Sequence, residues 1–134
     1  MAFTHNILIV DDQPGVRKFL SEAFTEEGYH VDTASNGVEA VKKAGAKLPS
    51  LILLDVKMPG MSGLETLEGL RQIAPDIPVV MMTAYGELDI IAEAKKRGVK
   101  CYINKPFDLY EVRYLVKGLL AEEDLKREME KDIG

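Results

Sequence analysis

Five short apolar runs alternate along this 134-residue chain with five longer stretches in which apolar residues recur at helical spacing. A short apolar run suits a buried strand, and an apolar residue at every third or fourth position suits a helix packed on one side. Strict alternation of the two predicts a parallel sheet with helices on both faces. The expected strands are ILIV at 7–10, HVDTA at 30–34, LILL at 51–54, VVMM at 79–82 and CYI at 101–103.

The stretches between these runs carry residues that begin and end helices. Pro14 suits the first position of a helix, where its missing N–H has no partner to lose. Ser62 and Glu65 have the spacing of a capping box. Gly28 and Gly98 can adopt the left-handed conformation that ends a helix. The expected helices lie near 16–24, 37–46, 63–73, 87–97 and 109–120.

The composition of the strands predicts their order. The runs at 7–10, 51–54 and 79–82 are apolar on both faces and suit the centre of the sheet, whereas the mixed runs at 30–34 and 101–103 suit its edges. With right-handed crossovers this gives an α/β fold, a doubly wound five-stranded parallel sheet of (βα)5 type in the order 2-1-3-4-5. Ligands bind such sheets at the carboxyl ends of the strands, where the strand order reverses.

Composition excludes several classes of protein. The net charge of −5 argues against direct binding to nucleic acid or to an anionic membrane. The single cysteine, Cys101, excludes an internal disulfide and fits a reducing compartment. No leader precedes residue 7 and no apolar run could span a bilayer. We therefore expect a cytoplasmic protein with one domain over residues 1–121 and a charged helical extension over 122–134.

Polar residues follow four of the expected strands. Asp11 and Asp12 follow the first strand, Asp55 the third, Thr83 the fourth and Lys105 the fifth. Each alone has an ordinary structural explanation, such as a helix cap, a turn or a solvated lysine. Together they place three mutually repelling carboxylates, a hydroxyl and an ammonium at one edge of the sheet. Such a cluster suits Mg²⁺, with Mn²⁺ as an alternative, and could place a phosphoryl group on a carboxylate.

The segments around these residues resemble response regulator receiver domains over residues 6 to about 120. They read ILIVDDQPG, LILLDVKMPGMSG, VVMMTAYGE and INKPF. The resemblance implies the flavodoxin/CheY-like fold and makes Asp55 the phosphoacceptor. It implies that Mg²⁺ is held by Asp11, Asp12, Asp55 and the backbone carbonyl of Lys57. It also implies a cis peptide bond between Lys105 and Pro106.

The same resemblance assigns residues that respond to phosphorylation. Thr83 would bond one phosphoryl oxygen and Lys105 would pair with another. Tyr102 stands at a position where receivers that change conformation carry an aromatic ring, which rotates inward as the threonine moves. Thr83 and Tyr102 are therefore the expected switch residues.

A narrower resemblance, through DDQPGVR, TAYGELDIIAEAKKRG and KPFDLYEVR, is to the single-domain regulators of the sporulation phosphorelay. These take a phosphoryl group from a histidine kinase and pass it to a histidine phosphotransferase. The resemblance implies a partner-binding face around the first helix and the loops of the site. Its expected members are Gln13, Gly15, Val16, Phe19, Tyr85, Gly86, Pro106 and Phe107.

Four functions remain open on the sequence. The first is a stand-alone phosphorelay carrier, phosphotransferase-like in its chemistry, for which the sequence does not decide between enzyme and carrier. The second is the receiver domain of a longer regulator whose output domain is switched by phosphorylation. A phosphatase with an aspartyl intermediate is disfavoured because its two aspartates are usually two residues apart on the first strand. A flavodoxin-like carrier is disfavoured because Asp11 and Asp12 would repel the phosphate of the flavin.

Overall fold

The computed structural model describes residues 5–84, 87–99 and 101–133, and within them the predicted sheet is confirmed. The parallel strands lie in the order β2-β1-β3-β4-β5. Their bounds are β1 Asn6–Val10, β2 His30–Ala34, β3 Leu51–Asp55, β4 Val79–Thr83 and β5 Cys101–Asn104. The helices are α1 Pro14–Glu26, α2 Gly37–Ala46, α3 Gly63–Ile73, α4 Leu88–Lys96 and α5 Leu109–Ile133.

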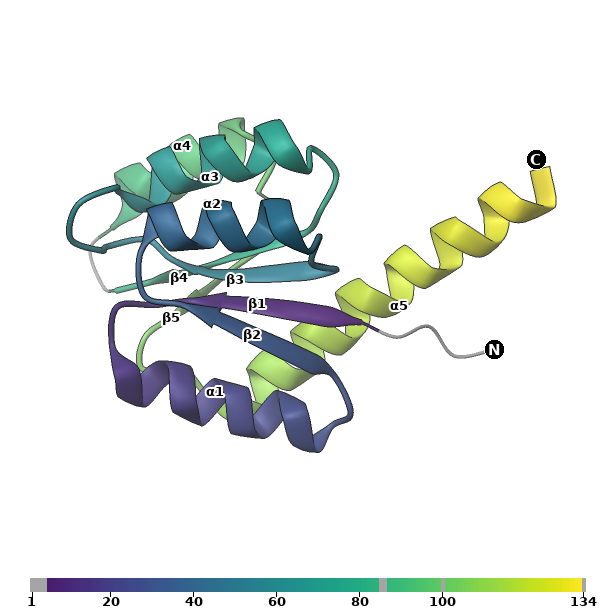
Figure 1. Cartoon of the computed structure of the whole chain (residues 1–134), viewed down its shortest axis with the longest axis horizontal. Coiled ribbons are helices and arrows are strands. Elements are labelled where there is room, and N and C mark those ends of the chain that lie inside the picture. The colour runs from purple at the N-terminus through teal and green to yellow at the C-terminus, as the bar shows by residue number, and fades with distance from the viewer. Residues whose placement is uncertain (1–4, 85–86, 100, 134) are drawn as a thin grey trace.

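Helices cover the sheet on both sides. Helices α2, α3 and α4 pack on one face, and α1 and α5 pack on the other (Figure 1). Successive residues of β1 therefore enter different cores: Leu8 contributes to the first and Ile9 to the second. This explains why the central strands β3 and β4 are buried throughout, whereas the edge strand β5 alternates between half-buried and exposed residues.

The helix ends follow the expected local chemistry. Pro14 opens α1, and Ser62 and Glu65 form the predicted capping box at the start of α3. Gly28 and Gly98 have φ values of +94° and +89°, the conformation for which a glycine was expected. The prediction for α4 was too long by one residue at each end.

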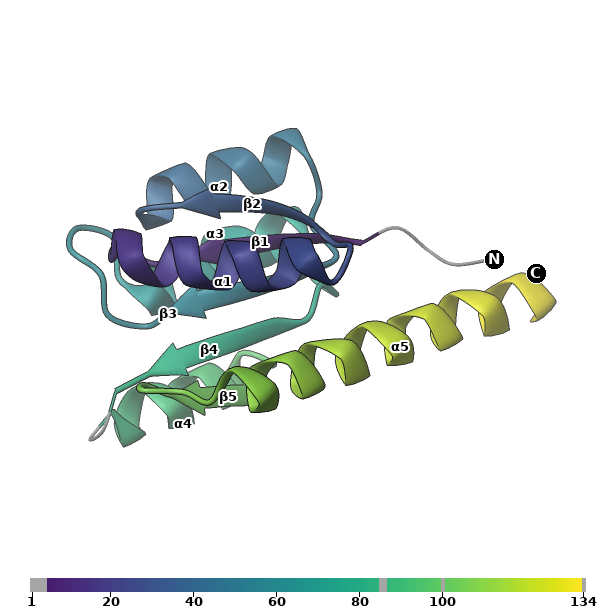
Figure 2. The same cartoon turned by 90° about the horizontal axis from the view of Figure 1, so that it is seen from below.

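Helix α5 continues without a break from Leu109 to Ile133 and projects beyond the sheet on the side where β1 begins (Figures 1 and 2). Val112, Val116 and Leu120 anchor its first half in the core beneath the sheet. Farther along, Asp124 Oδ2 lies 3.1 Å from Nε2 of the buried His5, which directly precedes β1. No described helix is both long enough and apolar enough to cross a membrane.

Candidate functional site

The three aspartates predicted at the strand ends are brought together. Because Val10 of β1 is in register with Leu54 of β3, Asp11 and Asp55 emerge side by side. Carboxylate oxygens of Asp11, Asp12 and Asp55 lie within 4.8 Å of one another. Asp11 and Asp55 are buried and Asp12 is exposed. The cluster stands at the carboxyl edge of the sheet, where β1 and β3 end.

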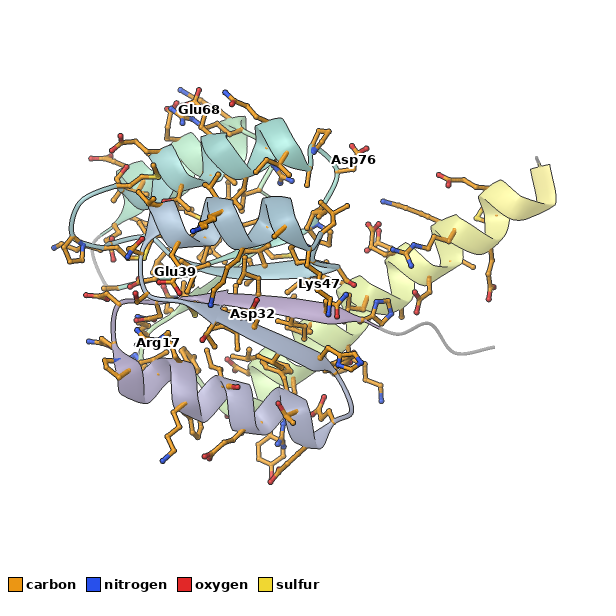
Figure 3. All side chains as sticks on the ribbon, viewed as in Figure 1. Arg17, Asp32, Glu39, Lys47, Glu68 and Asp76 are labelled. Carbon is orange, nitrogen blue, oxygen red and sulfur yellow. The ribbon has the colours of Figure 1, made fainter. Side chains whose placement is uncertain are left out.

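Asp11 is held rigidly by three groups. The backbone N–H of Gln13 donates to Asp11 Oδ1 at 2.9 Å, and Lys105 Nζ lies 2.6 Å from Asp11 Oδ2. Arg17 Nη1 donates to the Asp11 carbonyl at 2.7 Å. Figure 3 shows Arg17 near the same end of the sheet. Arg17 was not among the residues predicted for the site; its place in the first turn of the helix that follows the acidic pair was the available signal.

Asp55 is a buried carboxylate whose negative charge is only weakly compensated. Burial, followed by the negative charge of Asp11, raises its pKa from 3.8 to about 6. Two groups act in the opposite direction: Lys105 Nζ at 3.5 Å from Oδ2, and the Lys57 N–H at 3.4 Å from Oδ1. An added cation would stabilise the negative charge of such a buried, weakly compensated carboxylate. Its oxygens can act as a nucleophile.

Lys105 reaches the cluster through a fixed backbone. Its N–H donates to the Thr83 carbonyl at 2.6 Å, and the Lys105–Pro106 peptide bond is cis, as the resemblance implied. Burial works to lower the pKa of the Lys105 ammonium, but the hydrogen bond to Asp11 and the charge of Asp55 outweigh it and raise the pKa. Lys105 is therefore a permanent positive charge beside Asp55.

The expected switch residues face away from Asp55. The buried hydroxyl of Thr83 lies 3.1 Å from Asn104 Oδ1 and 3.2 Å from the Ile103 carbonyl, both on β5. The Tyr102 ring is 41% exposed, with Lys95 Nζ 5.4 Å from its centroid. Thr83 and Tyr102 nevertheless line one small apolar gap beneath α4. Asn104, a hydrogen-bond partner of Thr83, was not singled out in the sequence, although it lies in the INKPF segment.

The described members of the expected partner face gather around the same edge of the sheet. Gln13, Gly15 and Phe19 are exposed at the start of α1, and Val16 is half-buried beside them. On the loop after β5, Pro106 is exposed and Phe107 is half-buried. Phe19, 49% exposed, is the largest apolar side chain offered to solvent on α1. The remaining two members, Tyr85 and Gly86, lie outside the described residues.

Comparison with known proteins agrees with this geometry. Residues 7–117 match the family described as the response regulator receiver domain. The chain is 48% identical over 114 residues to sporulation initiation phosphotransferase F of Bacillus subtilis (strain 168), an alignment that covers 85% of this chain and 92% of the relative. It is 37% identical over 129 residues to regulatory protein AtoC of Escherichia coli (strain K12), covering 96% of this chain but 28% of that longer protein.

Solved structures of receiver proteins share the fold of this chain. A CheY-like receiver domain protein from Methanospirillum hungatei JF-1 superposes with a TM-score of 0.88 at 29% identity, covering 92% of this chain and 99% of the other. NtrX from Brucella abortus superposes with a TM-score of 0.88 at 28% identity, covering 96% of this chain and 29% of the other. The sheet order, the acidic edge and these matches agree, and the chain belongs to the receiver domains of two-component response regulators.

Proposed function

We propose that this receiver accepts a phosphoryl group from a phosphohistidine of a sensor kinase onto Asp55 and passes it to a histidine phosphotransferase. The observation that carries the proposal is the pairing of a buried, weakly compensated Asp55 carboxylate with the fixed ammonium of Lys105, 3.5 Å away. A carboxylate Oδ of Asp55 attacks phosphorus and forms a P–O bond. The P–N bond of the phosphohistidine breaks, and its electron pair leaves with the imidazole.

The acidic cluster fits a hard divalent cation, because it offers oxygen ligands alone and an excess of negative charge. Asp11, Asp12, Asp55 and the backbone carbonyl of Lys57 would hold Mg²⁺ or Mn²⁺. When bound, the cation neutralises negative charge that otherwise keeps an incoming phosphoryl group away from the cluster. Lys105 contributes to the same neutralisation from the side of Asp11.

Phosphorylation gives Thr83 and Lys105 a new acceptor. Lys105 lies within reach of Asp55 and needs only to release Asp11 to pair with a phosphoryl oxygen. The Thr83 hydroxyl must leave its β5 partners to bond another. The gap that Thr83 shares with Tyr102 then changes shape, which biases the outward ring toward an inward position.

The relay role is supported by the extent of one match. The named phosphotransferase is aligned over 92% of its own length, so a protein of about this size performs phosphotransfer in Bacillus subtilis. The α1 surface around Phe19 and the loop at Pro106 flank Asp55 and offer a histidine-bearing helix a place to dock. We assign this face to both the kinase and the phosphotransferase.

A second function is favoured by a different match. The alignment with AtoC covers 96% of this chain, which includes most of α5, but only 28% of AtoC. A receiver that is the input part of a longer regulator would show this coverage. In that case Tyr102 and α4 pass the signal to an output domain instead of Asp55 passing on its phosphoryl group.

The acceptor is tested by incubating the chain with a small phosphodonor and Mg²⁺ and measuring its intact mass. The wild type is expected to gain one phosphoryl group, and Asp55→Asn none. Asp76→Asn is the matched control, because Asp76 is exposed at the opposite end of the molecule from Arg17 (Figure 3). Labelling of the Asp55→Asn chain would refute the assignment.

The relay role is tested with the phosphorylated chain and an isolated histidine phosphotransferase domain. A carrier is expected to lose its phosphoryl group to the histidine, and Phe19→Asp is expected to slow that step without affecting labelling by the small phosphodonor. A phosphorylated wild-type chain that keeps its phosphoryl group, while its α4 and Tyr102 resonances shift, would favour the regulator instead.

A further inference from the structure

Helix α5 carries a line of exposed apolar and small residues along its outer side. Tyr110 and Tyr114 are 78% and 83% exposed, and Leu125 and Met129 are 57% and 54% exposed. They account for four of the ten large hydrophobic side chains exposed among the described residues. Between the two pairs lie the exposed, small residues Gly118 and Ala121. We call these six residues the α5 stripe.

The α5 stripe faces away from the body of the protein. Tyr114 lies two positions from the buried Val112 and Val116, and Gly118 lies two positions from Val116 and Leu120. Two positions correspond to about 200° around a helix. The core side chains therefore point to the sheet and the stripe points outward. Figure 2 shows that the second half of α5 projects beyond the other elements.

The α5 stripe is symmetric about its own midpoint. Gly118 and Ala121, Tyr114 and Leu125, and Tyr110 and Met129 are placed at equal distances on either side of the midpoint between Leu119 and Leu120. A second α5 running in the opposite direction would set each aromatic residue against an aliphatic one. The small residues would meet at the centre, where two helices can approach closely.

We propose that the α5 stripe is the interface of a two-fold symmetric dimer in which the α5 helices of two copies of this chain pack antiparallel. An isologous interface needs one self-complementary surface, and the α5 stripe has that property. A stretch of large apolar side chains exposed in line is also uncommon on a monomer. The proposal concerns assembly and does not depend on Asp55.

The charges beside the α5 stripe fit the antiparallel arrangement. On a helix of 3.6 residues per turn, Glu111 and Lys126 lie on the same flank of the stripe. In the antiparallel pair they lie nearly opposite each other across the interface. The symmetry forms this contact between opposite charges twice. On the other flank, Glu128 lies opposite Tyr110, whose hydroxyl can donate to it.

Association is tested by sedimentation equilibrium of the full chain over a range of concentrations. The wild type is expected to reach twice the 14.9 kDa mass of the chain. Leu125→Asp is expected to stay at the single mass. Leu48→Asp is the matched control, because Leu48 is also 57% exposed but lies after α2, and it should dimerise as the wild type does. A wild type that remains a monomer, or a dimer unaffected by Leu125→Asp, would overturn the proposal.

Direction is tested by cross-linking in a Cys101→Ala background. Two single-cysteine chains, Tyr114→Cys and Leu125→Cys, are mixed and oxidised, and the products are separated by mass. The antiparallel pair brings position 114 of one chain to position 125 of the other, so the mixed disulfide should exceed both homodimers. A parallel pair would give the two homodimers instead, and that result would refute the antiparallel interface.

Discussion

Burial and the neighbouring charge of Asp11 raise the pKa of the Asp55 carboxyl from 3.8 to about 6. The folded state therefore binds the proton of this carboxyl more tightly than the unfolded state, and the contribution to stability is lost as the pH rises through 6. Asp55→Asn removes the charge and should raise the free energy of unfolding of the metal-free chain by about 1–2 kcal/mol at pH 8, allowing for solvent screening. Urea denaturation in the presence of a chelator should show this gain at pH 8 and none near pH 4.

Asp11→Asn is the control for this prediction. It removes one charge from the same cluster, but that charge is the one that pairs with Lys105 Nζ at 2.6 Å. We expect no gain in stability at pH 8 from this variant, because the half-buried ammonium of Lys105 loses its charged partner. Equal gains from both variants would mean that the number of charges, and not the burial of Asp55, sets the stability of the site.

At the scale of single residues, the sequence predicted that Asp11, Asp12, Asp55 and Lys105 meet, but not how they pair. Asp11, Asp12, Asp55, Thr83 and Lys105 were expected at one edge because parallel strands end together. The closer contact of Lys105 with Asp11 than with Asp55, and the turn of the Thr83 hydroxyl toward Asn104, depend on rotamers. Differences of about an ångström of this kind do not follow from strand order.

At the scale of elements, the loop that follows Asp55 is fixed by a close backbone contact. Gly63 begins α3, and a Cβ added there would lie 2.5 Å from the carbonyl oxygen of Val56, the residue next to Asp55. Gly63→Ala must displace backbone and should lower the free energy of unfolding by about 2–3 kcal/mol. Gly45→Ala in α2 meets its nearest atom at 3.8 Å and should stabilise the chain by about 0.5–1 kcal/mol. Urea denaturation gives the change in the free energy of unfolding for each variant. Equal changes in the two variants would mean that the close contact of Gly63 with Val56 does not set the cost.

The helix ends show where sequence patterns are informative. Pro14, Ser62, Gly28 and Gly98 act through local geometry, so α1 and α3 begin and end close to where they were expected. The expected helix near 109–120 was limited by its apolar pattern, which ends at Leu120. The following residues are charged helix formers without a proline or glycine before Gly134, so nothing local ends α5 there. Periodicity marks the packed part of a helix, not its full length.

At the scale of the whole molecule, the site and the projecting part of α5 lie at opposite ends of the sheet (Figure 1). The strand order that places them there was predictable, since only edge strands tolerate the polar residues of β2 and β5. The contact between His5 and Asp124 was not, because it joins residues 119 positions apart through a helix that extends past its own core. The separation makes it possible to alter the projecting part of α5 without altering the site.

Ending the chain after Ala121 tests this separation. The truncation removes Asp124 and leaves the Nε2 of His5, a residue 7% exposed, without its 3.1 Å partner. We expect the free energy of unfolding to fall by about 1–2 kcal/mol, the cost of an unsatisfied buried polar group. The rate of labelling by a small phosphodonor should not change. The free energy of unfolding of the truncated chain is measured in urea and compared with that of the full-length Leu125→Asp chain, so that self-association does not contribute.

The control is Asp124→Asn in the full-length Leu125→Asp chain. This substitution keeps an acceptor oxygen beside His5, so the free energy of unfolding should fall by less than half as much as in the truncated chain. If the truncated chain had the expected free energy of unfolding but were labelled slowly by the phosphodonor, the far end of α5 would act on Asp55 through the sheet.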